Sequence, residues 1–177
     1  MRDPYGSVVV IPPPVEDAIT EAAAAARVRP SLLMGLAWKE SSFLWWAAKF
    51  EPGYPYLWDV KNNRPTRVES ETGALGICSP ATELQFQRAS WGICQVMGAT
   101  AREFGFREPL LTHLLDVRLG ASYGAKYLAA LLTRHKGDEA DAVSAYNAGS
   151  PTDKNFNAYV SPVLTMAETY RRERGGL

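Results

Sequence analysis

The chain carries its longest helical pattern in DVRLGASYGAKYLAALLTRHK, residues 116–136. Small and apolar residues recur in it at steps of three and four, which indicates a helix with one buried stripe. The stripe consists of Val117, Ala121, Gly124, Leu128 and Leu131. Gly120 lies one turn before Gly124, and because neither has a Cβ another backbone could approach this helix closely. Gly137 is suited to end the helix.

Further helical patterns lie on both sides of this stretch, so the sequence predicts a mainly α fold. The expected helices cover about 15–27, 32–42, 80–88, 98–104, 138–147 and 156–174. Ser31 is expected to cap the helix at 32–42 after a break at Pro30, and that helix is expected to bury a face that includes Leu33, Leu36, Ala37, Glu40 and Leu44. Pro162 is expected to perturb the last helix or to mark its first turn.

The segment 43–79 differs from the helical parts. It combines helix-breaking Pro, Gly and Asn residues with a high aromatic content, which predicts a long structured loop with little strand. Its aromatic residues could stack on sugar rings or simply pack in the core: Trp45, Trp46, Tyr54, Tyr56 and Trp58.

Length and composition exclude several classes of protein. A chain of 177 residues is expected to form one domain, here residues 15–177, preceded by a Pro-rich arm at residues 1–14. Lys and Arg number 19, as do Asp and Glu, so the net charge is zero and a nucleic-acid partner is not expected. No apolar run approaches the roughly 20 residues needed for membrane insertion. The short run Val8–Ile11 is too short for a signal-peptide core, so we expect no secretion signal of its own.

Glu40 is the first candidate for chemistry. It falls on the apolar side of its predicted helix, where a carboxylate is costly unless it is paired or protonated. One interpretation is a boundary residue or an ion pair with a distant Arg. The other is a general acid whose pKa is raised by an apolar pocket.

Two further segments and the cysteines leave alternatives open. Gln95 lies in an apolar segment, where its amide needs partners from the backbone of a core turn or from a ligand. Tyr146 and Asn147 close a helix, where both residue types are common for structural reasons, so by themselves they are a weak signal of function. Cys94 is expected to be a buried thiol, and its pairing with Cys78 is left open. The two histidines have no ligands at helical spacing, so neither a metal nor a cofactor is expected.

The order of these motifs resembles the soluble lytic transglycosylase family of the lysozyme-like superfamily. The family pattern has Glu-Ser at a helix end, Gly-Leu-Met-Gln ahead of Thr-Ala, then Tyr-Asn-Ala-Gly and a closing Tyr-Val. Here these read Glu40-Ser41, Gly92-Ile93-Cys94-Gln95 ahead of Thr100-Ala101, Tyr146-Asn147-Ala148-Gly149 and Tyr159-Val160. The Ile93-Cys94 pair departs from the pattern. The roughly fifty residues between the first two motifs resemble phage and prophage members.

The resemblance implies a lysozyme-like domain that cleaves the β-1,4 bond between N-acetylmuramic acid and N-acetylglucosamine in peptidoglycan. Glu40 would act first as acid and then as base, giving 1,6-anhydro ends. Ser41 would hydrogen-bond near this centre, Gln95, Tyr146 and Asn147 would line the glycan groove, and Tyr159 would approach Glu40 or the sugar's acetamido group. We expect a monomer that acts at the bacterial cell wall or periplasm, encoded by a phage and either released through a holin or carried in the virion.

Two rival functions stay open. A muramidase or chitinase-like hydrolase would need a second carboxylate to activate water. The candidates are Glu51, which is the first to test, then Asp59, Glu69, Glu71 and Glu83. A non-catalytic glycan-binding or phage structural module would keep the fold without the reaction.

Overall fold

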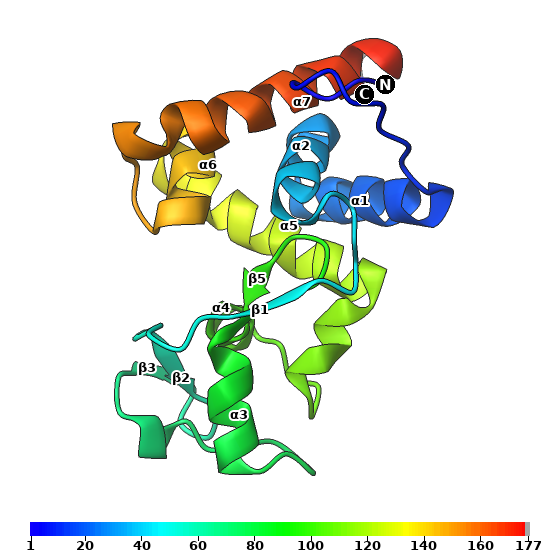
Figure 1. Cartoon of the computed structure of the whole chain (residues 1–177). Helices are drawn as coiled ribbons and strands as arrows, with labels where there is room; N and C mark the ends of the chain where they lie inside the picture. The colour runs from blue at the N-terminus through cyan, green and yellow to red at the C-terminus, as the bar shows by residue number, and fades with distance from the viewer. Residues whose placement is uncertain (176–177) are drawn as a thin grey trace.

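The computed structural model describes residues 1–175, and it confirms the predicted mainly α architecture (Figure 1). The predicted domain end at residue 177 lies outside the described residues. The helices are α1 (Pro13–Ala26), α2 (Pro30–Ser41), α3 (Pro80–Gln87), α4 (Gly98–Glu103), α5 (Val117–Arg134), α6 (Glu139–Ala148) and α7 (Ser161–Glu173). Short 3₁₀ turns cover Glu69–Glu71, Leu111–Leu115 and Asp153–Asn155, and a π-helical turn covers Phe156–Val160.

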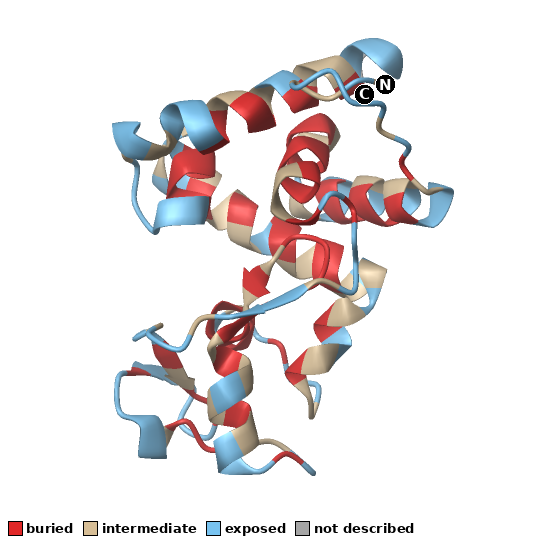
Figure 2. Cartoon of the chain, in the orientation of Figure 1, coloured by how far each residue is buried: buried red, intermediate tan, exposed pale blue. Residues whose placement is uncertain are grey.

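Helix α2 is the centre of the larger part of the molecule. It packs against α1, α5 and α7, and every residue from Ser31 to Trp38 is buried (Figure 2). Leu33, Leu36 and Ala37 of the expected face are buried, and burial extends beyond that face because neighbouring helices cover α2 on several sides. Leu44 lies beyond the helix end and is exposed. Gly35 allows the close contact with α7, since a Cβ there would lie 2.4 Å from the carbonyl oxygen of Val163.

The start of α2 also differs from the prediction. Arg29 is the N-cap and Pro30 occupies the first turn, where its missing N–H costs nothing. Ser31 is a buried helical residue, and its hydroxyl accepts a hydrogen bond of 2.8 Å from the Arg29 guanidinium. At the other end of the chain, Pro162 lies in the first turn of α7, as one of the two expectations had it.

Helix α5 crosses the middle of the molecule and carries the predicted stripe. Gly124 and Leu128 are buried with the rest of the stripe except Val117, which is half-buried. Both glycines are close-approach sites: a Cβ on Gly120 would lie 2.7 Å from the Leu114 carbonyl oxygen, and one on Gly124 would lie 2.4 Å from the Cβ of Cys94. The helix therefore supports the segment that contains Cys94.

The smaller part of the molecule contains α3, α4 and short strands (Figure 1). β1 (Ala48–Phe50), β4 (Ala89–Trp91) and β5 (Val96–Met97) form an antiparallel sheet in the order β1-β4-β5, and β2 (Leu57–Asp59) pairs with β3 (Arg64–Thr66). The segment 43–79 thus holds three strands of three residues each, in agreement with the expected scarcity of strand. Among the described residues, no helix combines the length and the apolar character needed to cross a membrane.

A buried ion pair holds this smaller part together. Glu83 of α3 and Arg102 of α4 are fully buried and form two hydrogen bonds of 2.8 Å. Gln87 donates to Glu83 and also bonds to the backbone of Trp58, which attaches β2 to the two helices. Because both charges are paired and hydrogen-bonded, their burial is tolerated.

Candidate active site

Glu40 lies in the last turn of α2 and faces a residue 119 positions away in the sequence. The hydroxyl of Tyr159 donates a hydrogen bond to Oε1 of Glu40. Burial raises the pKa of the Glu40 carboxyl to about 7, although the Tyr159 hydrogen bond and the positive charges of Lys39 and Lys49 act in the opposite direction. The carboxyl is therefore able to hold or release a proton near neutral pH.

Tyr159 reaches Glu40 from the π-helical turn Phe156–Val160 that precedes α7. Such turns are rare and are often found at functional sites. Burial, followed by the neighbouring charge of Glu40, raises the pKa of the Tyr159 hydroxyl well above its ordinary value. The hydroxyl therefore keeps its proton and stays a hydrogen-bond donor to Glu40.

The backbone turns sharply directly after Glu40 and Ser41. Ser42 and Phe43 both have left-handed φ angles, 52° and 67°, which is uncommon for residues other than glycine. The buried ring of Phe43 anchors this turn. The Ser41 hydroxyl donates to the carbonyl oxygen of Ile93 at 2.8 Å, so Ser41 connects the end of α2 to the segment Gly92–Gln95.

The segment Gly92–Gln95 is itself tightly held. Gly92 has a φ of 70°, and a Cβ there would lie 2.2 Å from the Leu114 carbonyl oxygen. The Gln95 amide nitrogen donates to Ala47 and Gly92 carbonyl oxygens at 3.0 and 2.8 Å, and its oxygen accepts from Ser90 at 2.8 Å. Gln95 is therefore bonded within a core turn, as one of the two interpretations expected, and it also lines the cavity described next.

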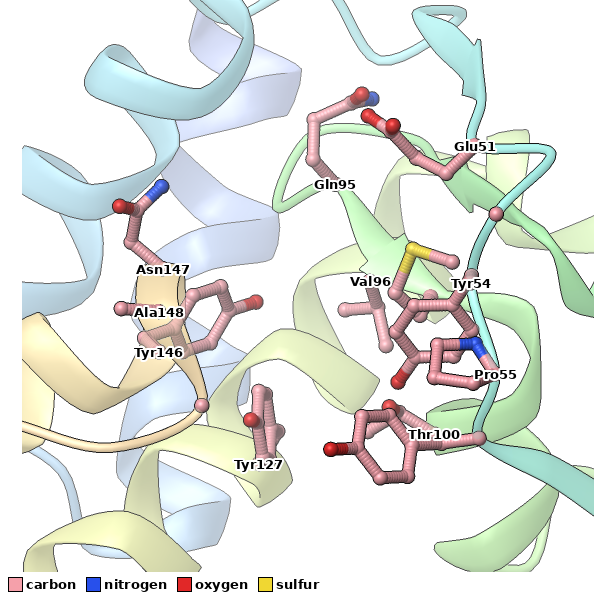
Figure 3. Close-up of a pocket in the computed structure, with 14 residues that line it drawn as sticks. Glu51, Tyr54, Pro55, Gln95, Val96, Thr100, Tyr127, Tyr146, Asn147 and Ala148 are labelled. Carbon is pink, nitrogen blue, oxygen red and sulfur yellow. The ribbon is translucent and has the colours of Figure 1, made fainter. Parts of the chain in front are cut away.

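A cavity of about 460 Å³ brings four of the predicted site residues together (Figure 3). Gln95 and Glu51 lie on one side of it, and Tyr146 and Asn147 lie on the opposite side. Glu40, Ser41 and Tyr159 are outside its lining. The remaining lining residues are Gly53, Tyr54, Pro55, Tyr56, Val96, Met97, Thr100, Tyr127, Ala148 and Gly149.

Tyr146 and Asn147 differ in how firmly they are held. The buried hydroxyl of Tyr146 donates to the carbonyl oxygen of Cys94 at 2.8 Å, which fixes the end of α6 against the segment Gly92–Gln95. Asn147 is exposed, and its side-chain oxygen accepts a bond of 3.2 Å from Asn155. Asn147 is therefore free to present its amide nitrogen to a ligand in the cavity.

Glu51 is the one predicted second carboxylate that lines this cavity. Its Oε1 lies 2.6 Å from the Nζ of Lys49, so the carboxylate is paired. The other candidates have partners elsewhere: Asp59 and Glu71 with Arg64, Glu69 with Arg88, and Glu83 with Arg102.

Several aromatic residues occupy places that the sequence left open. Tyr54 and Tyr56 line the cavity, whereas Trp45 and Trp46 form an exposed edge-to-face pair with ring centroids 4.5 Å apart. Tyr127 was not predicted as a site residue. The centroid of its ring lies 4.8 Å from that of Tyr146. Tyr127 follows Gly124 of the expected stripe by three residues, and this spacing could have placed it on the same side of the helix.

The structure also answers the question about the cysteines. Cys78 and Cys94 are both free and buried, and burial raises the pKa of each thiol. Within residues 1–175, His, Cys, Asp and Glu side chains form no cluster of three or more that could hold a metal ion.

Comparison with known proteins agrees with this architecture. A solved structure of the lytic transglycosylase Slt from Pseudomonas aeruginosa, an inactive mutant with Gln in place of Glu, matches with a TM-score of 0.59 and 18% identity. The match covers 90% of this chain but only 24% of that protein, so the chain spans about a quarter of its length. At this identity the match shows the fold, which is the predicted lysozyme-like one. No curated protein matches the sequence.

A family model describes the greater part of the chain. The model for the transglycosylase SLT domain matches residues 17–162, a range that contains Glu40, the segment Gly92–Gln95, Tyr146 and Tyr159. The chain therefore belongs to the transglycosylase SLT domain family.

Proposed function

We propose that this protein is a peptidoglycan lytic transglycosylase with Glu40 as its single acid and base. The observation that carries the proposal is the contact between Glu40 and Tyr159, in which the carboxyl has a pKa raised to about 7 by burial. A group that first donates and then accepts a proton works best with a pKa near the working pH. Family membership and the fold shared with a lytic transglycosylase support the same reaction class.

In the proposed reaction, Glu40 gives its proton to the glycosidic oxygen as the bond from that oxygen to C1 of N-acetylmuramic acid breaks. The resulting carboxylate takes the proton of the C6 hydroxyl, and the C6 oxygen bonds to C1. The products are a free N-acetylglucosamine hydroxyl and a 1,6-anhydro ring. No water is consumed, and Glu40 ends in its protonated form.

We assign the other site residues by their contacts. Gln95, Tyr146 and Asn147 would bind the glycan, because they line the cavity of about 460 Å³ from opposite sides. Tyr159 would position the Glu40 carboxyl. Ser41 would act as a positioning residue, because its hydrogen bond to Ile93 joins the end of α2 to the segment that carries Gln95.

A hydrolase is the second candidate function, favoured by one observation: Glu51 lines the cavity. An inverting hydrolase needs a second carboxylate about 6.5–9.5 Å from the acid. Glu51 is held in an ion pair, with its Oε1 2.6 Å from the Nζ of Lys49, and would have to leave that pair to bind a water, so we favour the transglycosylase.

The products that the protein releases from purified peptidoglycan distinguish a transglycosylase from a hydrolase. Mass spectrometry of a wild-type digest should show 1,6-anhydro ends, and Glu40→Gln should lower the rate by about 10²–10⁴-fold. The control Asp17→Asn, which removes an exposed carboxylate on α1, should retain the wild-type rate. Reducing muramic ends that disappear in Glu51→Gln would instead identify a hydrolase. A wild-type protein that binds the glycan without releasing products would be a non-catalytic module.

The place of action follows from the proposed substrate. We propose that the protein acts at the bacterial cell wall as a monomer. Phage origin, with release through a holin or incorporation in the virion, stays a prediction from the segment between the first two motifs, and a blot of purified virions would test it.

A further inference from the structure

A second cavity of about 540 Å³ adjoins the one that contains Gln95 and Asn147. The two cavities share Tyr54, Thr100, Tyr127 and Gly149 among their lining residues, so they meet at these residues. Beyond Tyr127, the second cavity is bordered by Trp58 of β2, Glu103 of α4 and Arg134 of α5.

Two opposite charges face this second cavity without protein partners. Within residues 1–175, neither Glu103 nor Arg134 takes part in an ion pair or a side-chain hydrogen bond, and both are exposed. Both charges act on the Tyr127 hydroxyl. Burial is the main cause of its raised pKa, the positive charge of Arg134 lowers this pKa, and the negative charge of Glu103 raises it.

Helix stability does not account for both charges. Arg134 ends α5, where a cation is favourable for the helix dipole, but Glu103 ends α4, where a carboxylate has the unfavourable sign. The second cavity therefore presents a cation and an anion that have no ion-pair partner within residues 1–175.

We propose that the second cavity binds the peptide carried by the glycan strand, and this inference rests on the proposed function. Arg134 would pair with a carboxylate of the peptide, and Glu103 would pair with an amino group of the same peptide. Peptidoglycan peptides provide both a carboxylate and an amino group, whereas a neutral sugar provides no charge for either side chain. A polyanion would be repelled by Glu103.

Binding to the full chain carrying Glu40→Gln tests the proposal without turnover. The probes are a soluble peptide-bearing disaccharide, the same disaccharide without its peptide, and two modified forms with the peptide carboxylates amidated or the amino group acetylated. Titration calorimetry with Arg134→Gln and Glu103→Gln should show about fivefold weaker binding of the peptide-bearing probe for each variant. The matched controls Lys126→Gln, on α5 outside both cavities, and Asp17→Asn should bind as the parent does.

The modified probes identify the partner of each charge. The amidated probe lacks the proposed partner of Arg134, so Arg134→Gln should bind it as tightly as the parent does. The acetylated probe lacks the proposed partner of Glu103, so Glu103→Gln should bind it as tightly as the parent does. Equal affinity of the parent for the probes with and without peptide would overturn the proposal. So would an equal loss of affinity, in Arg134→Gln and Glu103→Gln, for the probe with the peptide and the probe without it, because that result would indicate that the cavity holds sugars. Failure of the wild type to release any product from peptidoglycan would instead refute the proposed function and leave this binding result standing.

Discussion

Replacing Glu40 by Gln should stabilise the folded protein at alkaline pH. Folding raises the pKa of this carboxyl from 4.5 to about 7, so the folded state favours the protonated form. The stability that this group contributes is complete below pH 4.5 and is lost as the pH rises through about 7. Gln has nearly the same shape and no proton to release, so it stays neutral and the variant should escape this loss.

The pKa difference sets the size of the effect. A rise from 4.5 to about 7 corresponds to about 3 kcal/mol in the free energy of unfolding. Because Glu40 is partly exposed, solvent screening lowers this figure to about 2 kcal/mol. The stability of Glu40→Gln relative to the wild type should therefore rise by about 2 kcal/mol between pH 4.5 and pH 8.

Urea unfolding followed by tryptophan fluorescence measures this difference, since the chain contains 5 Trp residues. Wild type, Glu40→Gln and the control Asp17→Asn would be compared at pH 5, 6, 7 and 8. The control should differ from the wild type by less than about 0.5 kcal/mol at each pH. A Glu40→Gln difference that is constant from pH 5 to pH 8 would refute the reasoning, because it would mean that Glu40 titrates alike in the folded and unfolded chain.

Three further predictions follow from other contacts. Tyr159→Phe removes the hydrogen bond that lowers the pKa of Glu40, so the alkaline limit of activity should move to higher pH in a pH–rate profile, and an unmoved limit would contradict the assignment. Gly124→Ala adds a Cβ that would lie 2.4 Å from that of Cys94 and should cost about 1–3 kcal/mol, seen as a lower midpoint of thermal unfolding; an unchanged midpoint would argue against the close contact. Thiol titration in denaturant without reductant should count two free thiols, and a count of zero would show that Cys78 and Cys94 pair.

Local sequence signals predicted the helices well. Pro30, Gly105 and Gly149 lie within two residues of helix ends, and Gly137 lies three residues after the end of α5, as expected from fixed φ angles and from the ability of glycine to adopt a left-handed turn. The prediction of the buried stripe on α5 was correct because its period depends only on neighbouring residues of the same helix. The expected face of α2 is buried at Leu33, Leu36 and Ala37, but its periodicity did not indicate that helices from three other parts of the chain also bury the other sides.

The sequence by itself determined the fold class, the family resemblance and the identity of Glu40 as the first candidate. Each of these depends on residue types at short spacing or on the order of short motifs. Only the tertiary structure decided which side chains meet: that Tyr159 donates to Glu40, that Gln95 and Asn147 face each other across one cavity, and that Tyr127 lines both this cavity and a second one. The physical reason is that burial, pKa and cavity shape arise from contacts between segments far apart in the chain, and no local spacing encodes those contacts.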